Sequence, residues 1–161
     1  MRGAFVSKAA SLTVIAVIGL LGSNPIQAER RAPNPAAQVQ LVVDELNGRL
    51  TIPSEVTVWV VASNPLLVSV EPDKGRRGTF VMSFEETFLA QLDPTELRAV
   101  IAHELGHVWI FTHHPYLQTE RLANEVAMRV VSRQSLEKVY SKVWERGGAK
   151  GDLVQFLGAT Q

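Results

Sequence analysis

Two histidines and a glutamate near the middle of the chain are the residues best suited to chemistry. They lie in Ala102-His103-Glu104-Leu105-Gly106-His107. On a helix, residues four apart lie one turn apart on nearly the same face, so His103 and His107 can bind one metal ion. Glu104 then flanks the ion and can act as a general base on a water molecule. Alone, the motif also fits two histidines on the surface of an amphipathic helix.

The residues around this motif predict the helix that it requires. The segment Asp93-Pro94-Thr95-Glu96 has an acidic N-cap, proline at the first helical position and glutamate three residues after the cap. Apolar residues follow with a period near 3.6, which predicts a helix to about Phe111. Gly106 lowers helix propensity by about 1 kcal/mol, which suggests that another element approaches the helix closely there.

A catalytic zinc site needs a third protein ligand, and Glu120 is the best candidate. We expect Glu120 on a helix spanning roughly Tyr116–Ser132 that folds back against the first. Asn124 lies one turn further on the same face, and its amide could orient a metal-binding imidazole. His113 has the spacing of a metzincin ligand, but the glycine which that class requires is replaced by Ile110. The alternative for Glu120 is a solvated charge on the helix surface.

Two stretches of the chain resemble the gluzincin metallopeptidases, especially the M48 group. The run Leu92–Ile101, which leads directly into the His-Glu-x-x-His motif, looks like their active-site helix. The Glu120-x-x-Ala123-Asn124 element is similar to the Glu-x-x-Ala-Asp of M48, and closer to the Glu-x-x-Ala-Asn of ImmA/IrrE-like peptidases. The resemblance covers about Leu92–Val131. The chain departs from M48 in having Asn124 in place of Asp and a short interval before Glu120.

This resemblance implies an α+β fold of minimal zincin-like type, in which a small sheet accompanies an active-site helix and a following ligand helix. It implies a Zn²⁺-dependent endopeptidase acting on peptide or protein substrates. His103, His107 and Glu120 would bind zinc, and Glu104 would be the catalytic acid and base for a zinc-activated water. In gluzincins an edge strand just before the active-site helix typically binds extended substrate, and Thr79–Phe84 matches that position. The same segment also fits an ordinary core strand, and the sequence does not separate the two.

Peptide hydrolysis also needs a hydrogen-bond donor for the oxyanion of the tetrahedral intermediate. The candidates near the motif are Tyr116, His113 and His114. The two histidines also fit an exposed polar loop, and Tyr116 also fits the apolar start of the next helix.

Patterns elsewhere in the chain predict an α+β arrangement of one helix, a small sheet and further helices. We expect helices over about Ala36–Leu50 and Ser135–Arg146, and a short last helical turn over Leu153–Leu157. The β-branched and aromatic runs Val56–Ala62, Leu66–Val70 and Thr79–Phe84 predict strands. The last two strands flank the turn Asp73–Gly78 and so predict a hairpin.

The first segment of the chain has the layout of a secretory signal peptide. Arg2 and Lys8 precede an apolar stretch over 9–22, and Ala28 closes a small-residue cleavage site. We therefore predict a signal peptide over residues 1–28, a linker over 29–37 and the zincin-like domain over 38–161. The protein would be secreted or periplasmic. Alternatively, the apolar stretch remains uncleaved as a membrane anchor, although it is short of the roughly 20 residues that a span needs.

The composition excludes several classes of protein. Sixteen basic and sixteen acidic residues among 161 give no electrostatic argument for nucleic-acid binding, and the absence of cysteine excludes disulfides and Cys-type zinc sites. Three interpretations remain open: an active exported zinc peptidase, a non-catalytic zinc-binding domain that acts through a protein partner, and a membrane-anchored accessory protein with a structural metal site.

Overall fold

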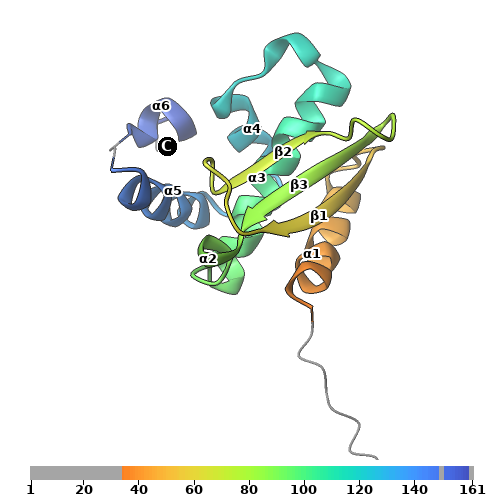
Figure 1. Cartoon of the computed structure of the whole chain (residues 1–161). Coiled ribbons are helices and arrows are strands. Elements are labelled where there is room, and N and C mark those ends of the chain that lie inside the picture. The colour runs from red at the N-terminus through yellow and green to blue at the C-terminus, as the bar shows by residue number, and fades with distance from the viewer. Residues whose placement is uncertain (1–33, 149–150, 160–161) are drawn as a thin grey trace, which may run out of the picture. The chain divides into compact units, whose positions relative to one another are not determined.

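A computed structural model describes residues 34–148 and 151–159 of the chain. One helix, a three-stranded sheet and further helices follow one another as predicted (Figure 1). The α+β class and small zincin-like domain are therefore confirmed. The helices are α1 (Pro35–Arg49), α2 (Glu86–Leu89), α3 (Pro94–His113), α4 (Glu120–Ala127), α5 (Arg133–Gly147) and α6 (Leu153–Leu157), with a 3₁₀ turn η1 (Pro115–Leu117); the strands are β1 (Glu55–Val61), β2 (Val68–Pro72) and β3 (Thr79–Glu85).

The predicted signal peptide and the first five residues of the predicted linker lie outside the described residues. The end of that linker, residues 35–37, forms the first turn of α1, because the side chain of Asn34 caps the helix and Pro35 fits its first position. Within the described ranges, no helix is both long and apolar enough to span a membrane.

The sheet has the strand order β1-β3-β2. β2 and β3 form the predicted antiparallel hairpin, while β1 pairs with β3 in parallel. Of the two interpretations of Thr79–Phe84, the core strand is therefore correct and the substrate-binding edge is not, because β3 has a neighbour on each side. β2 also begins two residues later than predicted, since Leu67 has a positive φ of 64° in the turn before it.

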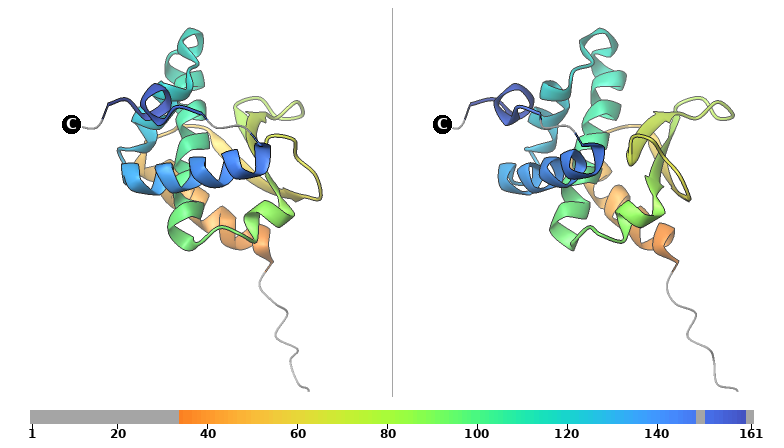
Figure 2. Two further views of the ribbon diagram at one scale, coloured as in Figure 1. Left: turned by 90° about the vertical axis from the view of Figure 1, so that its left-hand side faces the viewer. Right: turned by 60° about the vertical axis from the view of Figure 1, so that its left-hand side comes forward.

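Helix α3 is the central element that the other layers cover. It packs against β2 on one side, against α1, and against α4 and α5, which crosses it (Figure 2). Its start is a capping box, as predicted: the Asp93 carboxylate accepts from the backbone N–H of Thr95 and Glu96, and the Glu96 carboxylate accepts from that of Asp93. A buried helix with a fixed start gives the histidine motif a rigid support.

The predicted helix over Tyr116–Ser132 is replaced by shorter elements. Pro115 begins the turn η1, and α4 starts only at Glu120, where the hydroxyl of Thr119 caps it by accepting from the backbone N–H of Leu122. α4 ends at Ala127, and the hydroxyl of Ser132 then caps the next helix, α5. The short helix α2, capped by Glu85, was not predicted.

Candidate metal centre and active-site cleft

Helices α3 and α4 approach each other closely at Gly106. A Cβ atom at this position would lie 2.3 Å from the backbone oxygen of Ala123. Real Cβ atoms do not come this close to oxygen, so a side chain there would push the two helices apart. The absence of a side chain at Gly106 therefore lets α4 bring Glu120 and Asn124 against the histidine face of α3, as the sequence suggested.

We expect Gly106→Ala to destabilise the protein by about 1–3 kcal/mol, the usual cost of overpacking, and to weaken metal binding. The reason is that α4 must move away from α3, and Glu120 moves with it. Urea unfolding and a zinc titration would measure the two effects. Gly48 in α1 is the matched control, because a Cβ there meets nothing within 4 Å. An equally mild effect of both substitutions would contradict this account.

Three side chains converge between α3 and α4. The Nε2 atoms of His103 and His107 lie 3.2 Å and 3.5 Å from the two carboxylate oxygens of Glu120. Tetrahedral zinc with bonds of about 2.0–2.1 Å separates its ligand atoms by about 3.3 Å. One ligand atom from each of the three residues lies within 4.8 Å of the other two. These distances, together with the His₂Glu donor set, fit a zinc ion held by the three residues.

The Nδ1 atoms of both imidazoles, which face away from Glu120, also lie within hydrogen-bond distance of side chains. His103 Nδ1 lies 2.9 Å from the side-chain oxygen of Asn124, which is the contact that the spacing of Glu120 and Asn124 predicts. His107 Nδ1 lies 3.2 Å from the side-chain oxygen of Gln118, whose amide donates back to the His107 carbonyl. Both rings can therefore carry their proton on Nδ1 and turn Nε2 toward Glu120.

The charges at this centre favour an anionic carboxylate beside two imidazoles. Hydrogen bonds from His103 and His107 hold the pKa of the Glu120 carboxyl group well below its usual range. Burial alone would lower the pKa of His107, but hydrogen bonds to Glu120 and Gln118 outweigh it and raise that pKa. A carboxylate that stays ionised is the form that a cation binds.

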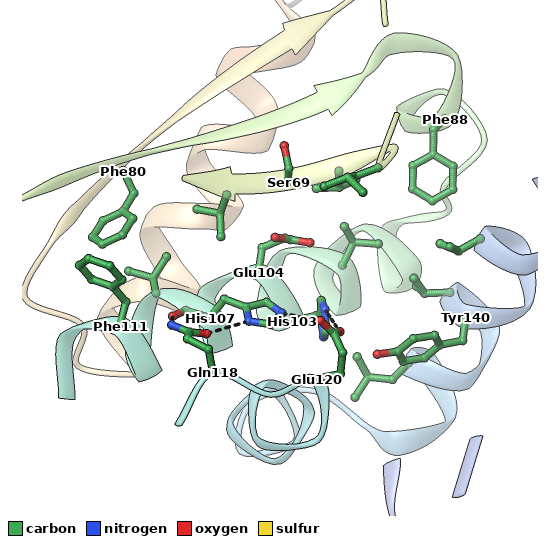
Figure 3. A pocket seen from close by; sticks show the side chains of 18 of the residues that line it. Ser69, Phe80, Phe88, His103, Glu104, His107, Phe111, Gln118, Glu120 and Tyr140 are labelled. Atoms are coloured by element: carbon green, nitrogen blue, oxygen red, sulfur yellow. Dashed lines mark hydrogen bonds and ion pairs between the residues drawn. The ribbon is translucent and has the colours of Figure 1, made fainter. Parts of the chain in front are cut away.

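The centre lies in a cleft of about 450 Å³ between β2, α3 and α5 (Figure 3). Glu104 projects from α3 toward β2 (Figure 3), the strand whose residues Val68, Ser69 and Val70 line the cleft. Its side chain is buried, and burial raises the pKa of its carboxyl group, with the charges of the two histidines opposing the rise. The rest of the lining is mostly apolar.

The comparisons with known proteins agree with this geometry. The model of peptidase family M48 matches residues 33–160. The chain belongs to peptidase family M48. No match was found among curated proteins or among solved structures. Because M48 peptidases are zinc-dependent, membership supports a metallopeptidase, a hydrolase of peptide bonds, and accounts for the metal-binding group described above.

The three oxyanion-donor candidates do not reach the cleft of this M48 chain. Tyr116 lies in η1 and is 97% exposed. His113 stacks on Trp109 with ring centroids 4.3 Å apart, and His114 lies near the same ring. These residues lie away from the cleft because α3 continues through His113, two residues past the predicted end, and the chain then turns at Pro115. The expectation that they serve the site finds no support in their positions.

Two residues that sequence reasoning missed do line the cleft. Gln118 comes from the loop before α4, and Tyr140 comes from α5 with its hydroxyl pointing into the cleft (Figure 3). The ring of Tyr140 lies edge-on to that of His103, with centroids 6.1 Å apart. Neither residue has a helical spacing to the motif, so no pattern in the sequence connects it to the metal centre.

Proposed function

We propose that the chain is an exported zinc endopeptidase. In this proposal His103, His107 and Glu120 bind the zinc ion, and Glu104 is the general base. The observation that carries it is the convergence of these three ligand groups at the wall of a cleft into which Glu104 projects. Membership of family M48 supports the same type of reaction.

The chemistry divides between the metal and the side chains of the cleft. When bound, zinc lowers the pKa of a coordinated water molecule and polarises a carbonyl oxygen. Glu104 takes a proton from the attacking water and delivers it to the leaving amine. Tyr140, in place of the exposed Tyr116, donates a hydrogen bond from its hydroxyl group to the carbonyl oxygen of the substrate.

Strand β2 is the element that we propose for binding the substrate backbone. Among the residues that the structure describes, it pairs with β3 on one edge and with no strand on the other, and Val68, Ser69 and Val70 line the cleft. An extended peptide can add to such an edge through main-chain hydrogen bonds. We therefore assign the binding of extended substrate, which the sequence suggested for Thr79–Phe84, to β2, the neighbouring strand of the hairpin.

Export is proposed from the first segment of the sequence. Basic Arg2 and Lys8, the apolar stretch over 9–22 and the small Ala28 support a signal peptide that directs the domain out of the cytoplasm. The substrate would then be a peptide or protein in the periplasm or outside the cell.

The proposed function is tested by the metal content of the purified protein, measured beside Glu120→Gln. We expect about one zinc ion per wild-type chain, cleavage of an unfolded protein substrate, and loss of both in the variant, because His₂ alone leaves the three-ligand site incomplete. Glu125→Gln is the matched control, since Glu125 lies on the same helix but pairs with Arg121. A folded wild-type chain that takes up no zinc would overturn the proposal.

A further inference from the structure

The side-chain amide of Asn124 is completely buried, and both its oxygen and its nitrogen form hydrogen bonds. Its oxygen faces His103 Nδ1 at 2.9 Å. Its nitrogen donates to the hydroxyl of Tyr140 at 2.7 Å and to the backbone carbonyl of Phe156 at 3.0 Å. Asn124 therefore connects a proposed zinc ligand on α3 with the C-terminal helix α6.

The carbonyl of Phe156 determines which way this amide points. A backbone carbonyl only accepts hydrogen bonds, so the NH₂ group of Asn124 must face it. The amide oxygen is then left for His103, and an oxygen that only accepts requires the proton on Nδ1. Nε2 of His103 is thereby the nitrogen that faces Glu120, where the metal would bind.

Helix α6 is held in place by Arg133, at the start of α5. The guanidinium group donates to the backbone oxygens of Leu157 at 2.7 Å and Gly158 at 2.8 Å, and its Nε donates to Glu137 at 2.8 Å. The side chain of Leu157 is buried in the core. A helix of five residues is not stable alone, so its position depends on such contacts.

We infer that α6 is a structural part of the metal centre and that Arg133 is a positioning residue for it. Arg133 fixes α6, the Phe156 carbonyl fixes the Asn124 amide, and that amide fixes the orientation of His103. The inference rests on the proposed zinc site. It also explains why Asn124 stands where the M48 pattern has Asp: a carboxylate could accept from His103 but could not donate to the Phe156 carbonyl.

The first test compares Arg133→Met with Arg98→Met. Arg98 makes two guanidinium hydrogen bonds to Glu45 on α1, compared with three for Arg133, and is likewise partly exposed, so its loss controls for general destabilisation. We expect Arg133→Met to weaken zinc binding about tenfold in a chelator competition, as loss of an outer partner does, and Arg98→Met to leave it unchanged. Arg133→Lys, which can donate to one carbonyl, should recover part of the affinity.

A second readout does not need zinc. In the metal-free protein we expect the Nδ1 proton of His103 to give a slowly exchanging NMR signal in the wild type and in Arg98→Met, and a faster exchange in Arg133→Met. If Arg133→Met keeps both this signal and the zinc affinity, the inference is wrong. If the wild type binds no zinc, the proposed function fails, and the His103 signal still tests the role of α6.

Asn124→Asp is the sharpest variant for the same inference. It restores the residue of the M48 pattern, yet we expect it to weaken zinc binding by about 10-fold to 100-fold, because two oxygens would then face each other at Phe156. Urea unfolding shows that the variant is folded before the titration. Zinc affinity equal to that of the wild type would mean that the Phe156 carbonyl does not select asparagine, and would overturn the inference.

Discussion

Glu104→Gln is expected to lower kcat for peptide cleavage by about 10²–10⁴-fold while zinc stays bound. The amide has the size of the carboxyl group but cannot accept a proton from water. Glu104 is not one of the three converging ligand groups, so the metal-binding set remains intact. The measurement is cleavage of an unfolded protein substrate at saturating concentration, with the zinc content of both proteins determined on the same samples.

This variant also separates an enzyme from a binding protein. Glu125→Gln, on the exposed side of α4, is the control and should cleave at the wild-type rate. A Glu104→Gln protein that cleaves as fast as the wild type would remove Glu104 from the mechanism. A wild-type protein that holds zinc but cleaves no substrate would favour the non-catalytic zinc-binding domain that acts through a partner.

Short-range patterns predicted the parts of the centre that lie on one helix or on two helices in close contact. His103 and His107 share a face because four residues make about one helical turn. Gly106 marked the approach of α4 because a helix interior seldom carries glycine without a packing reason. Asn124 follows Glu120 by one turn, and the structure brings both against the histidines.

Contacts between distant segments could not be predicted in the same way. Tyr140 reaches the cleft because α5 crosses α3, and Phe156 reaches Asn124 because α6, to which Arg133 donates hydrogen bonds, packs beside α4. The strand order could not be predicted either. The turn between β2 and β3 predicts a hairpin, but it does not determine whether β1 pairs with β2 or with β3. Local propensity contains no information on such tertiary choices, which depend on burial over the whole domain.

Tyr140→Phe is expected to lower kcat by about 10²–10³-fold, the usual cost of removing one oxyanion donor. The Tyr140 hydroxyl oxygen already accepts from Asn124, so its own proton is the group available to a substrate in the cleft. Burial raises the pKa of Tyr140 to about 12, so the hydroxyl keeps that proton at neutral pH. Phenylalanine retains the ring that packs against Trp144 and Phe156. We therefore expect KM and zinc affinity to change little.

The matched control is Tyr116→Phe, because Tyr116 is the donor that the sequence suggested and is almost fully exposed. It should leave kcat, KM and zinc affinity unchanged. A loss of zinc affinity in Tyr140→Phe that parallels the loss of kcat would mean that Tyr140 acts through Asn124 and positions the metal ligand. Equal rates for Tyr140→Phe and the wild type would exclude both roles. A loss of kcat alone assigns the hydroxyl to the reacting carbonyl, which is where its position in the cleft directs it.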